Sequence, residues 1–126
     1  MTVSIGNIAI YVSDLERSER FYTAGLGLQV LARVEAPEVS EVIVGTPGEG
    51  SQLMLAWDRA SSEPVEPSGI WKVFLFSDDA AASFDAAVAA GAAPVAPPKR
   101  LEQFRITIAL VADPDGYLIE IGQRDG

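Results

Sequence analysis

One acidic residue stands inside an apolar strand near the C-terminus and is the first candidate for chemistry. Glu120 lies within the segment 117–122, which otherwise carries apolar side chains and follows a Pro-Asp-Gly turn at 114–116. These turn residues predict a hairpin between a strand that begins near Phe104 and the strand that contains Glu120. A carboxylate inside such a hairpin is paired with a cation, bound to a metal or used in catalysis.

The residue types that the chain lacks limit what Glu120 can do. The sequence contains no His and no Cys, so neither an imidazole nor a thiol is available as a base, nucleophile or metal ligand. Acid–base chemistry would fall to carboxylates, Lys or Tyr, and a metal ion would find only oxygen ligands and water. The lack of Cys also fits a reducing compartment, and we expect a cytoplasmic protein.

Length and charge exclude several classes of partner. With 126 residues, 48% of them hydrophobic, the chain has the size of one ordinary domain with its own core. The net charge of −9 is spread evenly, with four basic and nine acidic residues in 1–63 and five basic and nine acidic residues in 64–126. Phosphate backbones need a concentrated basic surface, so we expect no nucleic-acid partner. No apolar run of membrane-spanning length and no signal-peptide pattern is present, so we expect no membrane partner.

The predicted elements follow one order twice. The first half is expected to contain a strand at 5–12, a helix capped by Asp14, and strands at 28–34, 39–44 and 52–57. The second half is expected to contain a strand at 70–76, a helix capped by Ser77 or Asp78, a short strand near 94–96, and a hairpin of 104–111 with 117–122. An offset of 65 aligns the two halves. We therefore predict a single α+β domain of two βαβββ modules, 1–58 and 69–126, joined by a linker at 59–68.

The alternation of side chains along these strands predicts a mixed face on the side away from the helices. Its polar members are expected to be Asn7, Gln52, Lys72, Arg105, Thr107 and Glu120. Its apolar members are expected to be Tyr11, Met54, Phe74, Phe76 and Leu118. Such a composition is typical of a ligand cleft, although the aromatic side chains could equally fill a core between sheets. Trp57 and Trp71 have the opposite parity and are expected in the core.

Both ends of the chain resemble one known superfamily. The segment from Asn7 to Tyr22, followed by Gly25-Leu26-Gly27-Leu28, resembles the opening of the vicinal oxygen chelate superfamily, and the segment from Asp113 to Glu120 resembles its closing motif. That superfamily includes glyoxalase I, methylmalonyl-CoA epimerase, extradiol dioxygenases, fosfomycin resistance enzymes and bleomycin resistance proteins. The resemblance implies a glyoxalase/bleomycin resistance fold, with a curved, partly closed mixed sheet around a cleft. It also implies a homodimer.

The resemblance further implies where a metal would be held in metal-dependent members. The matching positions are Asn7, Met54, Lys72 and Glu120, and only Glu120 is a ligand that those members use. A Met thioether is too soft for a hard divalent ion, and a Lys ammonium cannot ligate until it loses its proton. We therefore predict no catalytic metal and no other cofactor, although Asn7 and Glu120 could hold a hard ion weakly with waters.

Lys72 at one of these positions suggests that its ammonium replaces the metal's charge and pairs with Glu120. Three roles for the pair are open. It could be a structural salt bridge, a proton-transfer pair in which Lys72 holds an enolate oxygen, or an anchor for a ligand. Arg105 is either a carboxylate or phosphate anchor or an exposed edge residue. Three acidic residues, Glu35, Glu38 and Glu41, are expected at the surface, where they would favour a cationic ligand.

These observations lead to three hypotheses of function. The first is metal-free binding of a small hydrophobic or cationic molecule, in the manner of bleomycin resistance proteins. The second is a lyase or isomerase of the glyoxalase or epimerase type, with Glu120 transferring a proton and Lys72 stabilising an oxyanion. The third is an interaction module whose cleft has lost its activity.

Overall fold

A computed structural model describes residues 1–61 and 63–125. The chain divides into two compact units, Met1–Val65 and Glu66–Gly126. The boundary falls inside the linker expected at 59–68, of which Ser62 lies outside the described residues. Within the described residues, no helix is both long and apolar enough to cross a membrane.

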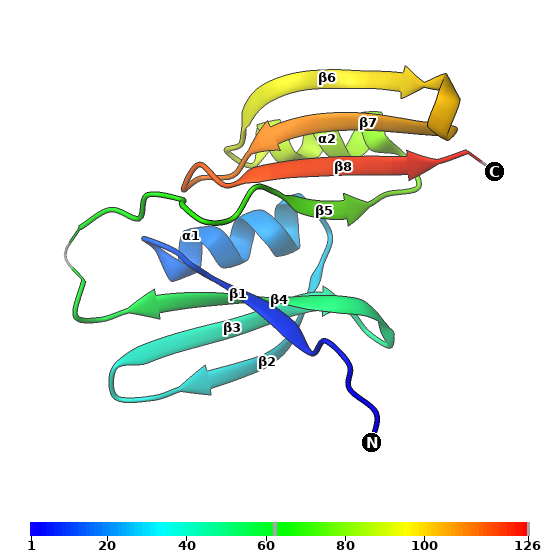
Figure 1. Ribbon diagram of the computed structural model, residues 1–126. Helices are drawn as coiled ribbons and strands as arrows, with labels where there is room; N and C mark the ends of the chain where they lie inside the picture. The colour runs from blue at the N-terminus through cyan, green and yellow to red at the C-terminus, as the bar shows by residue number, and fades with distance from the viewer. Residues whose placement is uncertain (62, 126) are drawn as a thin grey trace. The chain divides into compact units, whose positions relative to one another are not determined.

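The first unit combines helix α1 with a four-stranded sheet, as the ribbon shows (Figure 1). Its elements are β1 (Asn7–Tyr11), α1 (Leu15–Arg20), a π-helical turn (Phe21–Gly25), β2 (Gln29–Glu35), β3 (Val39–Thr46) and β4 (Glu49–Asp58). The strands form a sheet in the order β1-β4-β3-β2, in which β1 runs parallel to β4 and the other neighbours are antiparallel. Helix α1 begins after Asp14, whose side chain accepts a hydrogen bond from the Arg17 backbone N–H, as the sequence predicted.

The second unit repeats this order (Figure 1). Its elements are β5 (Val73–Phe76), α2 (Ala80–Ala89), β6 (Ala93–Leu101), a 3-10 turn (Glu102–Phe104), β7 (Ile106–Ala112) and β8 (Leu118–Arg124). The sheet order is β5-β8-β7-β6, and β5 runs parallel to β8. The equivalent topology of the two four-stranded mixed sheets, neither of which is closed, confirms the predicted α+β class and the doubled βαβββ pattern.

Each sheet packs its buried side chains toward its own helix. In the first unit Ile10, Val44 and Leu55 are almost fully buried, and α1 contacts β3 and β4. In the second unit Val111 and Ile119 are fully buried, and α2 contacts β6, β7 and β8. Because side chains alternate along a strand, the intervening residues of each sheet lie on the face away from the helix. We call these the open face of unit 1 and the open face of unit 2.

The helix caps show the repeat most directly and correct one prediction. Helix α2 is capped by Asp79, whose side chain accepts from the Ala82 backbone N–H at 3.0 Å, so the predicted cap at Ser77 or Asp78 is wrong. The Ser77 hydroxyl instead accepts from the Asp79 N–H and bonds to Ser83. The caps at 14 and 79 are 65 residues apart, the offset expected from the sequence.

Two further elements differ from expectation. Strand β6 is longer than the short strand expected near 94–96, although it contains three prolines. It is an edge strand, where a residue without an N–H can be tolerated. Trp71 was expected in the core but is 78% exposed. Since β5 begins only at Val73, the alternation that was extended back to Trp71 does not apply there.

Candidate functional site

An ion pair between Lys72 and Glu120 is the central feature of the open face of unit 2. In the parallel pairing of β5 with β8, Val73 is opposite Ile119 and Phe74 is opposite Glu120. Lys72 precedes β5, and its Nζ is ion-paired with Oε1 of Glu120. The two side chains are only 24% and 12% exposed, so solvent screens this pair less than a surface salt bridge.

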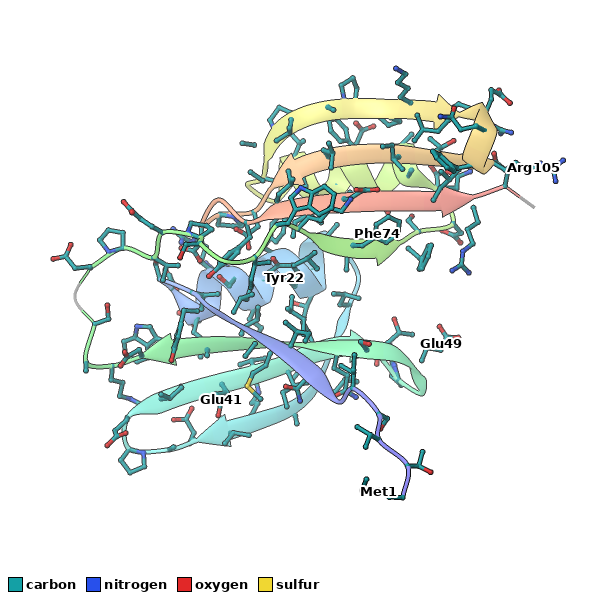
Figure 2. All side chains as sticks on the ribbon, in the orientation of Figure 1. Met1, Tyr22, Glu41, Glu49, Phe74 and Arg105 are labelled. Atoms are coloured by element: carbon teal, nitrogen blue, oxygen red, sulfur yellow. The ribbon has the colours of Figure 1, made fainter. Side chains whose placement is uncertain are left out.

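Aromatic rings share the open face of unit 2 with the ion pair. The Lys72 ammonium lies 4.0 Å from the centre of the Trp71 ring, within the range of a cation–π interaction. Phe74, labelled in Figure 2, contacts Phe76 edge-to-face with 4.9 Å between ring centres. The Arg124 guanidinium lies 3.7 Å from the centre of the Phe76 ring. Unit 2 thus presents an aromatic surface with the Lys72–Glu120 ion pair on one side and Arg124, the last residue of β8, on the other.

Four of the expected ligand residues share the open face of unit 1. Asn7 is opposite Gln52 in the β1–β4 pairing, and the next residues on this face are Ala9 opposite Met54 and Tyr11 opposite Ala56. Asn7 and Tyr11 are exposed, while Gln52 and Met54 are half-buried. The parity predicted for these four residues is therefore confirmed, and their role in binding stays a prediction.

The two registers place the four positions that the resemblance matches to a metal site at equivalent points of the repeat. Ala9 is opposite Met54 in unit 1 as Phe74 is opposite Glu120 in unit 2. Asn7 precedes Ala9 by two residues, as Lys72 precedes Phe74 by two. Where unit 2 carries the pair Lys72 and Glu120, unit 1 therefore carries Asn7 and Met54.

Two expected site residues lie elsewhere. Thr107 is opposite Gln123, whose side chain accepts a hydrogen bond from the Ala80 N–H at the start of α2, so Thr107 faces the helix and its predicted place beside Glu120 is wrong. Leu110 is the residue opposite Glu120. The reason is the length of the hairpin loop. Since Ala112 is opposite Leu118, the loop has an odd number of residues, and this shifts the parity of β7 against β8.

Arg105 also lies outside the strand on which it was placed. It follows the 3-10 turn with a left-handed φ of 51°, and its side chain is exposed. Leu118, by contrast, lies on β8 with the same parity as Glu120, as expected.

A hollow on the open face of unit 1 was missed by the sequence analysis. It has a volume of about 250 Å³ and is lined by Ala9, Ile10, Tyr11, Val39, Glu41 and Ala56. The alternation of Val39, Glu41 and Ile43 along β3 was the available signal that Glu41 shares a face with Tyr11. The depth of the hollow depends on the small residues of neighbouring strands, which only the register reveals.

The donor groups do not suit a divalent metal ion. The Glu120 carboxylate is held by the Lys72 ammonium, and a metal at Glu120 would have to displace that cation. The other matching positions offer the thioether of Met54 and the amide of Asn7, a poor set for a hard ion. Among residues 1–61 and 63–125, no group of three or more His, Cys, Asp or Glu side chains is placed to hold a metal.

Comparison with known proteins identifies the family. A family model described as the Glyoxalase/Bleomycin resistance protein/Dioxygenase superfamily matches residues 4–121. The chain belongs to this superfamily. The match confirms the resemblance inferred from the two terminal motifs. This chain is also similar to a probable lactoylglutathione lyase of Vibrio parahaemolyticus. The two are 30% identical over 117 residues, which are 90% of this chain and 85% of the relative.

Solved structures of the superfamily share the fold. Glyoxalase I from Zea mays superimposes with a TM-score of 0.84 at 21% identity, covering 97% of this chain and 45% of the maize chain. This chain thus spans about half the length of the maize enzyme. A superfamily member from Sphaerobacter thermophilus superimposes with a TM-score of 0.78 at 22% identity and covers 98% of both chains.

Proposed function

We propose that this superfamily member binds a small hydrophobic or cationic molecule and does so without a metal ion. The observation that carries the proposal is the ion pair between Lys72 and Glu120. The ammonium already supplies a positive charge to the one carboxylate that matches a metal ligand of the superfamily. The aromatic surface beside it, formed by Trp71, Phe74 and Phe76, suits an apolar or planar ligand.

Metal analysis and ligand-induced stabilisation test this proposal. We expect the purified protein to contain far less than one divalent ion per chain and to keep its Tm after dialysis against a chelator. Tm should rise with compounds that bind, because a ligand that binds only the folded state stabilises it. One tightly bound divalent ion per chain would show the proposal to be wrong.

A second candidate function is a lyase or isomerase reaction, which the likeness to a probable lactoylglutathione lyase favours. Glu120 would accept the proton from a carbon next to a carbonyl, Lys72 would stabilise the enolate oxygen, and Glu120 would return the proton to the neighbouring carbon. Formation of lactoylglutathione from methylglyoxal and glutathione is the direct assay. If Glu120→Gln removes this turnover but keeps ligand-induced stabilisation, the enzyme proposal is right and the pure binder is wrong.

We also propose that the chain acts as a homodimer of single-domain subunits in the cytoplasm. The large exposed apolar residues outside the two candidate ligand surfaces, including Ile8, Val95 and Phe104 at 53%, 54% and 68% exposure, support association, since such side chains are more often covered in an assembly. Light scattering on the purified protein should give twice the mass of the chain. A monomer at micromolar concentration would contradict this.

A further inference from the structure

The hollow in unit 1 is built from a row of three residues on neighbouring strands. Tyr11 on β1 is opposite Ala56 on β4, and Ala56 is opposite Glu41 on β3. The side chains of Tyr11 and Glu41 therefore flank that of Ala56 on one face, and their backbones are two strand spacings, or roughly 10 Å, apart. Ala56 is too small to fill this space, so an aromatic ring and a carboxylate border a shallow floor.

Comparison of the two units explains why the space is open. The position equivalent to Ala56 in unit 2 is Gly122, which is opposite Phe76 as Ala56 is opposite Tyr11. There, the ring of Phe74 lies over Gly122 and fills the space above it. The residue of unit 1 equivalent to Phe74 is Ala9, which has no ring. The acidic group is also particular to unit 1, because the position equivalent to Glu41 is Ile108, opposite Gly122.

The charge of Glu41 is not neutralised within its unit. The segment 1–65 contains no Lys and only four Arg residues. Arg17 and Arg20 belong to α1, and Arg33 is ion-paired with Glu19 of that helix. Arg59 is ion-paired with Glu35, whose pKa is held below its ordinary value by hydrogen bonds from Ser40 and Arg59. Among the described residues of the unit, none of these cations forms an ion pair with Glu41.

We infer that this hollow binds the ammonium group of a small organic cation, with Glu41 as the countercharge and the Tyr11 ring as a cation–π surface. The inference rests on the proposed function in treating the protein as a small-molecule binder, and it names the ligand class and the residue that recognises it. A volume of about 250 Å³ is below the roughly 300–1,000 Å³ of sites for drug-sized ligands. The hollow therefore suits a small amine or the cationic end of a longer molecule.

Benzyltrimethylammonium and its neutral carbon isostere are suitable probes, and amide chemical shifts in NMR titrations report where each binds. We expect the cation to shift the amides of β1, β3 and β4 and the isostere to bind at least about tenfold more weakly, because it lacks the attraction to the carboxylate. Glu41→Gln should weaken cation binding by a similar factor. Glu49→Gln is the matched control, since it removes the same charge at the hairpin end of β4, away from the hollow (Figure 2). The affinity of the Glu49→Gln variant for the cation should equal that of the wild type.

Ala9→Phe provides a steric test that keeps the charge. Position 9 is exposed on a strand, where Phe is favourable, and the new ring should cover Ala56 as Phe74 covers Gly122. We expect loss of cation binding with an unchanged fold by circular dichroism, and Glu41→Gln remains decisive if this variant does not fold.

Equal affinity for the cation and its isostere, or an unchanged affinity in Glu41→Gln, would overturn the inference. So would a Glu41→Gln variant whose only change is in dimerisation, because the face would then be an interface between copies. A divalent metal ion bound at Glu120 would refute the proposed function but would not alter the result expected for Glu41→Gln. The two failures are therefore distinguishable.

Discussion

The ring of Phe74 lies against the backbone of Gly122, so close that a Cβ atom on residue 122 would stand 2.5 Å from Cζ of the ring. Glycine at this position lets the ring lie against the backbone of β8, on which Glu120 is the residue opposite Phe74. The contact therefore shapes the open face of unit 2, and it is the feature that unit 1 lacks.

Gly122→Ala should push the Phe74 ring off the strand. Because Phe74 is 39% exposed, the ring can swing outward, and we expect a destabilisation of about 1 kcal/mol, at the lower end of overpacking costs. Urea unfolding measures this. In the background of Phe74→Ala the same substitution should cost clearly less, because only Ile106 Cδ1, at 3.2 Å, then crowds the added Cβ. An equal cost in both backgrounds would show that the ring is not the obstacle.

Lys72 and Glu120 should be strongly coupled in a double-mutant cycle. Lys72→Met leaves a mostly buried carboxylate without its cation, and we expect a loss of about 1–3 kcal/mol, between the values for exposed and fully buried pairs. The double variant Lys72→Met/Glu120→Leu should lose less than the sum of the single variants, since no charge is then left unpaired. Additive losses would mean that the two side chains do not interact in solution.

The ion pair between Glu19 and Arg33 should make stability depend on pH in the acid range. Two hydrogen bonds from Arg33, at 2.6 and 3.0 Å, lower the pKa of Glu19 and connect α1 to β2. A carboxyl with a lowered pKa in the folded state binds its proton less readily than in the unfolded chain. The ion pair therefore stabilises the fold at pH values above the pKa of Glu19 in the unfolded chain. This stabilisation is lost as the pH falls through the pKa of Glu19 in the folded protein.

Glu19→Gln should accordingly lower Tm by a few degrees at pH 7 and by progressively less as the pH falls below the ordinary range of Glu. Thermal unfolding across that range measures the difference from the wild type. Glu16→Gln on the same helix is the matched control, because Glu16 is exposed and the substitution removes the same charge. A difference for Glu19→Gln that is independent of pH would contradict the assignment.

Patterns within single strands and helices allowed much of the fold to be predicted. The alternation in β1 and β4 put Asn7, Tyr11, Gln52 and Met54 on one face, and Asp14 marked the start of α1 correctly. These features depend on residues near one another in the sequence, where side-chain periodicity and capping act directly. The same reasoning placed Lys72 next to Glu120, with the superfamily resemblance supplying the pairing of strands.

Features that depend on register could not be predicted in the same way. Thr107 was placed on the wrong face because a change of one residue in the 113–117 loop reverses the parity of a whole strand. The hollow at Glu41 requires knowing that Ala56 lies between Tyr11 and Glu41, on strands whose partners are set by long-range pairing. Trp71 was misplaced because strand ends are the least certain part of a periodic pattern.

Substitution of Arg105 tests both its backbone conformation and its predicted role as a ligand anchor. Its left-handed φ of 51° costs a residue with a Cβ about 1–2 kcal/mol, whereas glycine adopts this conformation freely. Part of the gain from Arg105→Gly is offset by the greater freedom of glycine in the unfolded chain. We therefore expect Arg105→Gly to raise the free energy of unfolding by about 0.5–1 kcal/mol and Arg105→Val to lower it, since a β-branched residue is least tolerated there.

If Arg105 anchored a carboxylate or phosphate, Arg105→Gly would also abolish the Tm increase produced by an anionic ligand. Because its side chain is exposed and lies outside β7, we expect any ligand-induced increase in Tm to be the same in Arg105→Gly as in the wild type.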